Sequence, residues 1–340
     1  MTVGKTRQLL LLFRPSLNLP FRRNNSSYSS TTNEPKQRKF ATRDFEEIQI
    51  PVPWGHIAGK WYGPKHERPL VALHGWQDNA GTFDTLAPLL PRDIPILALD
   101  MPGHGLSSWL PDGINYHSID YVTLINRIMD EYKWDKISLM GHSMSSINSF
   151  VYCALFPQKV DLYIGLDVLK PLTRSAKSIV DILGERIESI SKVERRIRNK
   201  SEPPAYEWDQ LVERLHVGTN KSVDMDTCKF LLKRNIKPSE HEPHKYYFSR
   251  DGRLKNSLFY AFSQQVPVEM ARRITCPHLF IKALQAPYYE RKEYYDEVLA
   301  ILQQKPNFVY HEVEGSHHVH LNEPEKVAPL IISFLEKYRS

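Results

Sequence analysis

The sequence predicts an α/β fold in which a mostly parallel, doubly wound sheet carries helices on both faces and an inserted helical cap. Short apolar runs alternate with helical patterns over residues 69–166, and parallel sheets with crossover helices have this alternation. At residues 136–156 a strand-like run, a tight turn and a helical pattern follow one another directly. The alternation stops at residues 171–255, which are polar and charged. We therefore expect a sheet domain formed by residues 41–170 and 256–340, with a cap between them.

The expected strands begin with a hairpin, because Ile48, Ile50 and Val52 alternate with polar residues and a Pro-Trp-Gly turn follows, leading into residues 57–61. The later strands are short apolar runs bounded by turn residues, as strands buried in a parallel sheet are. They are expected at residues 69–73, 94–99, 137–140, 160–166, 277–283 and 308–312.

The expected helices have apolar residues at helical spacing. In the sheet domain they are expected at residues 82–90, 119–132, 147–154, 266–273, 288–303 and 324–338. In the cap they are expected at residues 178–199, 205–215 and 226–235. A peripheral insertion without a role in substrate binding is the alternative interpretation of the cap segment.

The tight turn in the middle of the chain is Gly141-His-Ser143-Met-Ser145. A strand, a turn with Ser at its tip and a helix form the arrangement called a nucleophile elbow. Its strained central residue requires small neighbours two positions away on either side. Gly141 meets this requirement, and Ser145 stands where the Gly-x-Ser-x-Gly pattern has a second Gly. The alternative is an ordinary turn from a strand to a helix.

Other polar residues follow expected strands in the same way. His74, Asp100 and Asp167 come directly after the strands at 69–73, 94–99 and 160–166. Ligands of parallel sheets bind beyond the carboxyl ends of the strands. We therefore expect these residues and Ser143 to meet at one rim of the sheet.

A histidine-rich loop, residues 315–324, separates the last expected strand from the last helix and contains His317, His318 and His320. A histidine in this loop can reach the elbow serine and act as its general base. Metal binding is the rival interpretation, but no Cys or acid stands at ligand spacing beside these histidines. The third interpretation is an exposed loop that is rich in histidine by chance and has no role.

The net charge of +6 comes from the start of the chain. Residues 1–40 contain eight Lys or Arg and one acid, which leaves 37 basic and 38 acidic residues elsewhere. The remainder therefore lacks the excess of positive charge that nucleic-acid-binding proteins have. An Arg- and Ser-rich, acid-poor leader is typical of a mitochondrial transit peptide. A disordered basic tail is the alternative, with a cytoplasmic or peroxisomal location.

The sequence also disfavours two classes of protein: those stabilised by disulfides or zinc, and those inserted in a membrane. Cys153, Cys228 and Cys276 are scattered, so we expect neither a disulfide framework nor a zinc site. No apolar stretch approaches the roughly 18 residues that cross a bilayer, so we expect no stable membrane insertion. We predict neither a cofactor nor a metal, and the oligomeric state stays open.

Taken together, His74-Gly75-Trp76, Asp100-x-x-Gly103-x-Gly105, the Gly141 elbow and Gly315-x-His317 resemble the α/β-hydrolase fold. The stretches at 73–84, 116–118 and 315–324 resemble, more narrowly, the serine hydrolase-like proteins. The resemblance covers about residues 45–338.

The resemblance implies that Ser143 attacks a small, mostly apolar carboxylic ester and that His317 is its general base, with His318 as the second choice. His320 stands where the family often has a further, non-catalytic histidine. The backbone N–H groups of Met144 and Trp76 would stabilise the oxyanion. His74 and Gly75 belong to the same substrate-binding turn.

The acid of the triad is left open. The family usually places an Asp after the strand at 277–283, and this chain has none there. Glu290 from the same loop and Asp167 after the preceding strand are the two candidates, and the third possibility is that no acid is present. Amides or thioesters are alternative substrates. The departures at Ser145 and at the acid also leave open a non-catalytic or weakly active small-molecule-binding protein on the same fold.

Overall fold

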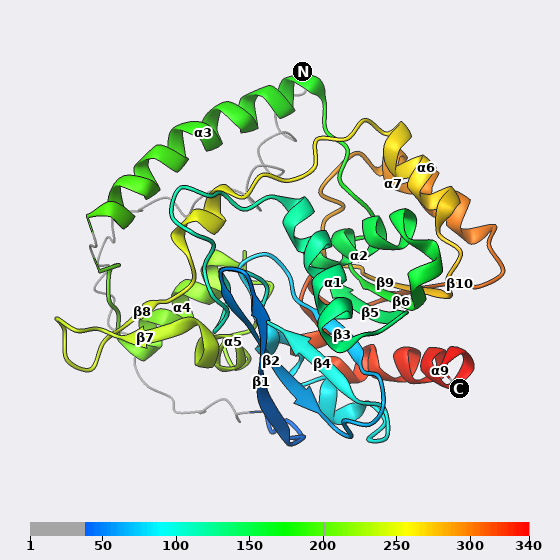
Figure 1. Ribbon diagram of the computed structural model, residues 1–340, viewed down its shortest axis with the longest axis horizontal. Coiled ribbons are helices and arrows are strands. Elements are labelled where there is room, and N and C mark those ends of the chain that lie inside the picture. Colours follow the sequence, from blue (N-terminus) through cyan, green and yellow to red (C-terminus); the bar gives the residue numbers. More distant parts are fainter. Residues whose placement is uncertain (1–37, 200–201, 340) are drawn as a thin grey trace, which may run out of the picture.

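The computed structural model describes residues 38–199 and 202–339 (Figure 1). The predicted basic leader therefore lies almost entirely outside the described residues. Within the described ranges, none of the helices is both long and apolar enough to cross a bilayer.

Eight strands of the described ranges form one sheet, in the order β1-β2-β4-β3-β5-β6-β9-β10. The pairs β1–β2 and β2–β4 are antiparallel, and all neighbours from β4 to β10 are parallel. This confirms the predicted mostly parallel sheet. The strands are β1 (Phe45–Val52), β2 (Gly55–Tyr62), β3 (Leu70–Leu73), β4 (Ile96–Leu99), β5 (Ile137–His142), β6 (Val160–Leu166), β9 (His278–Ala283) and β10 (Phe308–Val313).

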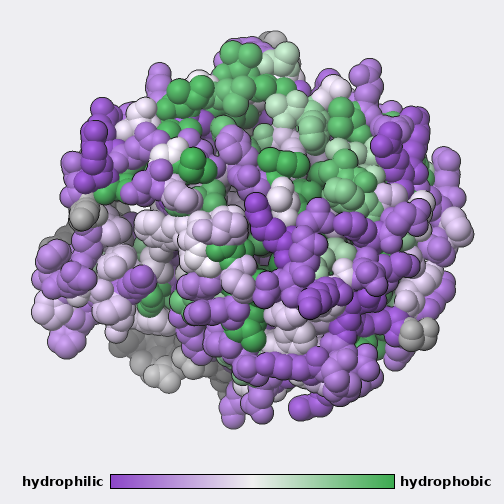
Figure 2. Space-filling model, in the orientation of Figure 1, coloured by the Kyte–Doolittle hydropathy of each residue, from purple (hydrophilic) through white to green (hydrophobic). Residues whose placement is uncertain are grey.

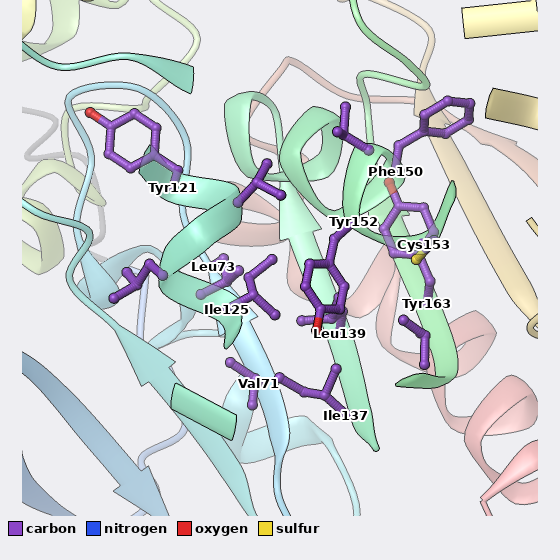
Figure 3. Close-up of a cluster of buried hydrophobic side chains, with 14 of the residues drawn as sticks. Val71, Leu73, Tyr121, Ile125, Ile137, Leu139, Phe150, Tyr152, Cys153 and Tyr163 are labelled. Atoms are coloured by element: carbon purple, nitrogen blue, oxygen red, sulfur yellow. The ribbon is translucent and has the colours of Figure 1, made fainter. Parts of the chain in front are cut away.

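Helices cover both faces of the sheet because its strands are apolar on both sides. Alternate residues of the central parallel strands, such as Leu73 and Ala72 in β3, belong to two different hydrophobic clusters. Figure 3 shows the first cluster, in which strand residues such as Leu139 pack against Ile125 and Phe150 of two helices. The second cluster lies between the other face and the C-terminal helix. The helices of the sheet domain are α1 (Ser118–Tyr132), α2 (Met144–Leu155), α6 (Gln265–Arg273), α7 (Lys292–Gln303), α8 (Val319–Asn322) and α9 (Ala328–Tyr338).

Two expected helices differ from the structure. The helix predicted at 82–90 is replaced by two 3₁₀ turns, η2 (Ala80–Phe83) and η3 (Ala87–Leu89). Pro88 has no N–H to bond to a preceding carbonyl, so a continuous helix cannot pass through it. The helix predicted at 288–303 begins only at Lys292, because Tyr289 adopts a left-handed conformation with φ 51°. Further 3₁₀ turns are η4 (Pro157–Lys159) and η6 (Pro324–Lys326).

The segment between β6 and α6 contains α3 (Ala176–Arg198), α4 (Trp208–Gly218), α5 (Cys228–Asn235), η5 (Gly252–Asn256) and a small hairpin of β7 (Ile236–Pro238) and β8 (Tyr246–Phe248). The sequence did not predict this hairpin. Helices α4 and α5 share a small hydrophobic cluster of their own, which Leu321 of α8 joins. Arg234 of α5 forms a buried ion pair with Asp100, with 2.8 Å between Nη2 and Oδ2. The segment is therefore anchored to the rim of the sheet.

The surface is mainly hydrophilic on the face shown in Figure 2, and hydrophobic residues gather in the upper half of that view. Helix α3, the long helix along the edge of Figure 1, leaves Val180 and Ile187 exposed by 69% and 62%. These apolar side chains belong to the segment that the sequence predicts as a cap.

Candidate active site

The turn between β5 and α2 holds Ser143 in a strained backbone conformation, with φ 53° and ψ −113°. Gly141 makes this turn possible, because a Cβ at that position would lie 2.4 Å from the carbonyl oxygen of Ser145. Ser145 itself is buried, and its hydroxyl donates to the carbonyl of His74 at 2.6 Å. A serine therefore fits where the elbow pattern has its second glycine, since its Oγ has a backbone partner there.

Replacing Gly141 with alanine is expected to lower the free energy of unfolding by about 3 kcal/mol or more, because the atoms that the new methyl group meets are backbone atoms that cannot turn aside. Urea denaturation measures the change. Gly184→Ala is the matched control, since that glycine lies in α3 with no atom within 4 Å of its would-be Cβ. Alanine there is expected to stabilise the protein by about 1 kcal/mol. Equal destabilisation by both substitutions would contradict the steric argument.

Three side chains from three strand ends form a continuous hydrogen-bonded chain. Ser143 Oγ lies 2.8 Å from Nε2 of His317, and Nδ1 of His317 lies 2.5 Å from Oδ2 of Asp167. Ser143 is partly exposed, whereas the other two side chains are buried. A nucleophile, a base within hydrogen-bond reach and an acid that orients the base are the parts that covalent catalysis by serine requires.

Asp167 is held in place from its other side. Its Oδ1 accepts hydrogen bonds from the Lys282 ammonium at 2.6 Å and from the Ala283 N–H at 3.1 Å. Burial alone would raise the pKa of Asp167, but the hydrogen bond from His317 and the charge of Lys282 outweigh it, so the pKa lies below its usual value. The carboxylate is therefore charged at neutral pH.

The hydrogen bonds also fix the state of His317. Burial, the largest influence, lowers the pKa of His317 to about 4. The imidazole is therefore neutral at pH 7. Because Asp167 accepts at Nδ1, the ring proton resides there, and the lone pair of Nε2 faces the Ser143 hydroxyl. This is the arrangement in which a histidine can take a proton from a serine.

Glu290, the other candidate acid, does not contact His317 in the described part of the chain. Its carboxylate accepts from the Lys170 ammonium at 2.6 Å and from the Thr173 N–H at 2.9 Å. Burial raises the pKa of Glu290, and the ion pair with Lys170 offsets part of that effect. The carboxylate that lies beside His317 is therefore that of Asp167, and Glu290 is paired with Lys170 instead.

The residues expected around the oxyanion lie at the start of α2 and in the loop after β3. Met144 is the first residue of α2, so its N–H is among those that a helix leaves without an intrahelical partner. Trp76 lies in the loop after β3, where its indole N–H donates to the Leu254 carbonyl at 2.8 Å. His74 is fully buried, and its ring nitrogens contact the Met101 N–H and the Gly75 carbonyl at 2.9 and 2.7 Å. Its side chain therefore shapes the turn.

Sequence reasoning missed two residues beside Asp167 and His317. Lys282 is buried, with 2% of its surface exposed, and it was visible as a lone charge inside the apolar run predicted at 277–283. Tyr289 places its ring 5.5 Å from the ring of His317, edge to face. No pattern in the sequence indicated Tyr289, because its contact depends on the left-handed turn.

The other histidines of the loop do not contact Ser143. His318 contacts Asp78 and Ser222, and His320 lies 3.0 Å from the Thr82 hydroxyl. The second choice for the base is therefore not supported by the geometry.

Comparison with known proteins agrees with this geometry. Residues 68–207 match the family model described as the alpha/beta hydrolase fold. The chain is 38% identical to a Drosophila melanogaster protein named "Probable serine hydrolase", over 90% of this chain and 92% of that one. It is 35% identical to a Danio rerio protein named "Serine hydrolase-like protein", over 86% and 89% of the two chains. The crystal structure of a hypothetical protein from Pseudomonas aeruginosa is similar, with a TM-score of 0.72, 29% identity and coverage of 86% and 99%.

Proposed function

We propose that this chain, which belongs to the serine hydrolase-like proteins of the α/β-hydrolase fold, cleaves small, mostly apolar carboxylic esters through an acyl-enzyme on Ser143. The observation that carries the proposal is the hydrogen-bonded chain from Ser143 through His317 to Asp167. A protein that only binds a ligand on this fold has no need of a serine so close to a neutral, oriented histidine.

In the first half of the reaction Ser143 Oγ attacks the ester carbonyl carbon while His317 Nε2 takes the hydroxyl proton. The carbonyl oxygen becomes an oxyanion, which the N–H groups of Met144 and Trp76 stabilise. Asp167 stabilises the imidazolium that forms beside it. Collapse of the intermediate breaks the bond to the alcohol oxygen, which receives the proton from His317.

In the second half a water molecule attacks the acyl carbon, with His317 again as the base. The bond to Ser143 Oγ breaks, the proton returns to the serine, and a carboxylic acid leaves. Each half of the reaction therefore begins and ends with a neutral His317, which its lowered pKa favours.

The substrate class is inferred from the side chains around the serine. The ring of Tyr289 lies against His317, and Trp76 packs edge to face on Phe259 with 6.3 Å between ring centroids. Aromatic rings at these positions are the basis on which we infer an apolar acyl group. The remainder of the chain is close to neutral beyond residue 40, which gives no attraction for a highly charged substrate.

The proposal is tested with three substrates that share one acyl group and differ in the leaving atom, which is oxygen, sulfur or nitrogen. The native chain is expected to hydrolyse the oxygen ester, and comparison with the matched thioester and amide measures its preference. It is also expected to react covalently with a fluorophosphonate probe, and His317→Ala is expected to remove that labelling because the serine then has no base. A folded native chain that is neither labelled nor active on any of the three would instead support the non-catalytic binding protein.

A further inference from the structure

Three buried polar atoms converge beside the catalytic histidine without taking part in the triad. They are Oδ2 of Asp78, Nδ1 of His142 and Nε2 of His318, all within 4.8 Å of one another. Asp78 Oδ2 lies 3.5 Å from the His142 nitrogen and 3.1 Å from the His318 nitrogen. None of the three side chains has more than 6% of its surface exposed.

The hydrogen bonds of His142 leave a lone pair at the centre of this cluster. Its Nε2 lies 2.9 Å from the carbonyl oxygen of His317, which can only accept, so the ring proton is on Nε2. Nδ1 then carries the lone pair, and no hydrogen-bond partner in the described part of the chain satisfies it. A buried imidazole nitrogen that faces a carboxylate, with no proton between them, is unfavourable unless a cation lies there.

His318 has the same arrangement at the opposite side. Its Nδ1 lies 2.9 Å from Ser222 Oγ, and that hydroxyl makes a shorter contact, 2.7 Å, with the carbonyl of Thr219. The single hydroxyl proton goes to the carbonyl, so Ser222 accepts from Nδ1–H of His318. The lone pair of Nε2 therefore also faces Asp78.

The separations from the carboxylate of Asp78 suit a small divalent ion. Bonds of about 2.0–2.2 Å in a tetrahedral arrangement place ligand atoms about 3.3–3.6 Å apart, and the separations from Asp78 Oδ2 are 3.1 and 3.5 Å. The nitrogens of His142 and His318 lie within 4.8 Å of each other, so binding would draw these two rings closer together. Gly75 borders the same place, since a Cβ there would lie 2.9 Å from His142 Nδ1 and 3.0 Å from Asp78 Oδ2. The absence of a side chain at Gly75 keeps the place open.

We propose that Asp78, His142 and His318 bind one divalent transition-metal ion, of which Zn²⁺ is the best match to two imidazoles and one carboxylate. Three protein ligands leave a fourth position for water. Each histidine also bonds its second ring nitrogen to an oxygen, His142 to the His317 carbonyl and His318 to Ser222, and zinc-binding histidines have such second partners. The ion would join the loop after β3, the elbow and the histidine loop.

The proposal does not depend on ester hydrolysis, so the test measures metal and not turnover. Untagged full-length chain, freed of metal by a chelator, is titrated with Zn²⁺ in a calorimeter, and the metal retained after desalting is quantified. One equivalent is expected. His318→Gln and Asp78→Asn are each expected to weaken binding at least about 100-fold, because each removes a ligand. His66→Gln, an exposed histidine outside the cluster, is the control and is expected to change nothing.

A second measurement with Co²⁺ reports the coordination itself. Four-coordinate Co²⁺ is expected to give visible absorption bands in the native chain that His318→Gln removes while the far-UV circular dichroism stays unchanged. The absence of stoichiometric binding to folded native chain would overturn the proposal, as would equal binding by the native chain and both cluster variants. Ser222 would then donate to His318 and His318 to Asp78, with protons alone filling the cluster.

Discussion

Replacing Ser143 with alanine is expected to lower kcat for an ester by about 10⁴- to 10⁶-fold, because the attacking oxygen is removed while the groups around the oxyanion stay in place. The hydroxyl has one contact of note, the 2.8 Å hydrogen bond to His317, so its loss leaves no large buried group without a partner. Stability is therefore expected to change by less than about 1 kcal/mol. The strained φ of 53° is, for alanine, no worse than for serine.

Ser149→Ala is the matched control for this substitution. Ser149 lies on α2, the helix that follows Ser143, is fully buried, and has no hydrogen-bond partner for its Oγ in the described part of the chain. Its replacement is expected to leave kcat unchanged. Steady-state turnover and fluorophosphonate labelling, measured side by side on both variants, check the prediction. Comparable turnover by Ser143→Ala and native chain would show that the observed activity comes from another site or from a contaminant.

The elbow illustrates what local sequence can predict. A strand, a tight turn and a helix are each specified by neighbours within a few positions, so Ser143 and its surroundings could be located from residues 136–156 alone. The parallel order of the sheet then followed from the alternation of elements. Pro88 shows the limit of that reasoning, because apolar spacing predicted a helix where one missing N–H breaks it.

Pairings between distant segments could not be predicted in the same way. His318 and Asp78 stand 240 positions apart and meet only because two strands place their ends at the same rim. The sequence argument against a metal looked for a Cys or an acid at ligand spacing beside the loop histidines, and it had no means of bringing Asp78 and His142 to that loop. Lys282 was one sign that an acidic side chain lies beside β9, because a lysine buried in a sheet requires a partner of opposite charge.

The assignment of the acid depended on the same kind of long-range contact. Asp167 and Glu290 both follow a strand or its loop, and nothing in their spacing indicates which carboxylate turns toward His317. The decisive features are the left-handed φ of 68° at Asp167 and the two donors, Lys282 and the Ala283 N–H, that fix its Oδ1. Glu290 turns instead to Lys170.

Asp167→Asn is expected to lower kcat about 10⁴-fold, because an amide can donate to Nδ1 of His317 and so favours the wrong tautomer. The substitution also leaves the Lys282 ammonium, 2.6 Å away and buried, without its counter-charge. We therefore expect a loss of about 3 kcal/mol or more in the free energy of unfolding as well. Kinetics must be measured at a temperature where circular dichroism shows the variant to be folded.

Glu290→Gln separates these two effects. It removes the charge from an ion pair that is as short and as buried as that of Asp167, between Glu290 and Lys170, and a similar loss of stability is expected. Because Glu290 does not contact His317, kcat is expected to stay within about threefold of the native value on the folded protein, since only interactions made in the transition state change it. If both variants lost kcat equally, the catalytic assignment of Asp167 would be wrong, and the shared effect would come from the loosening of the loops that both ion pairs hold.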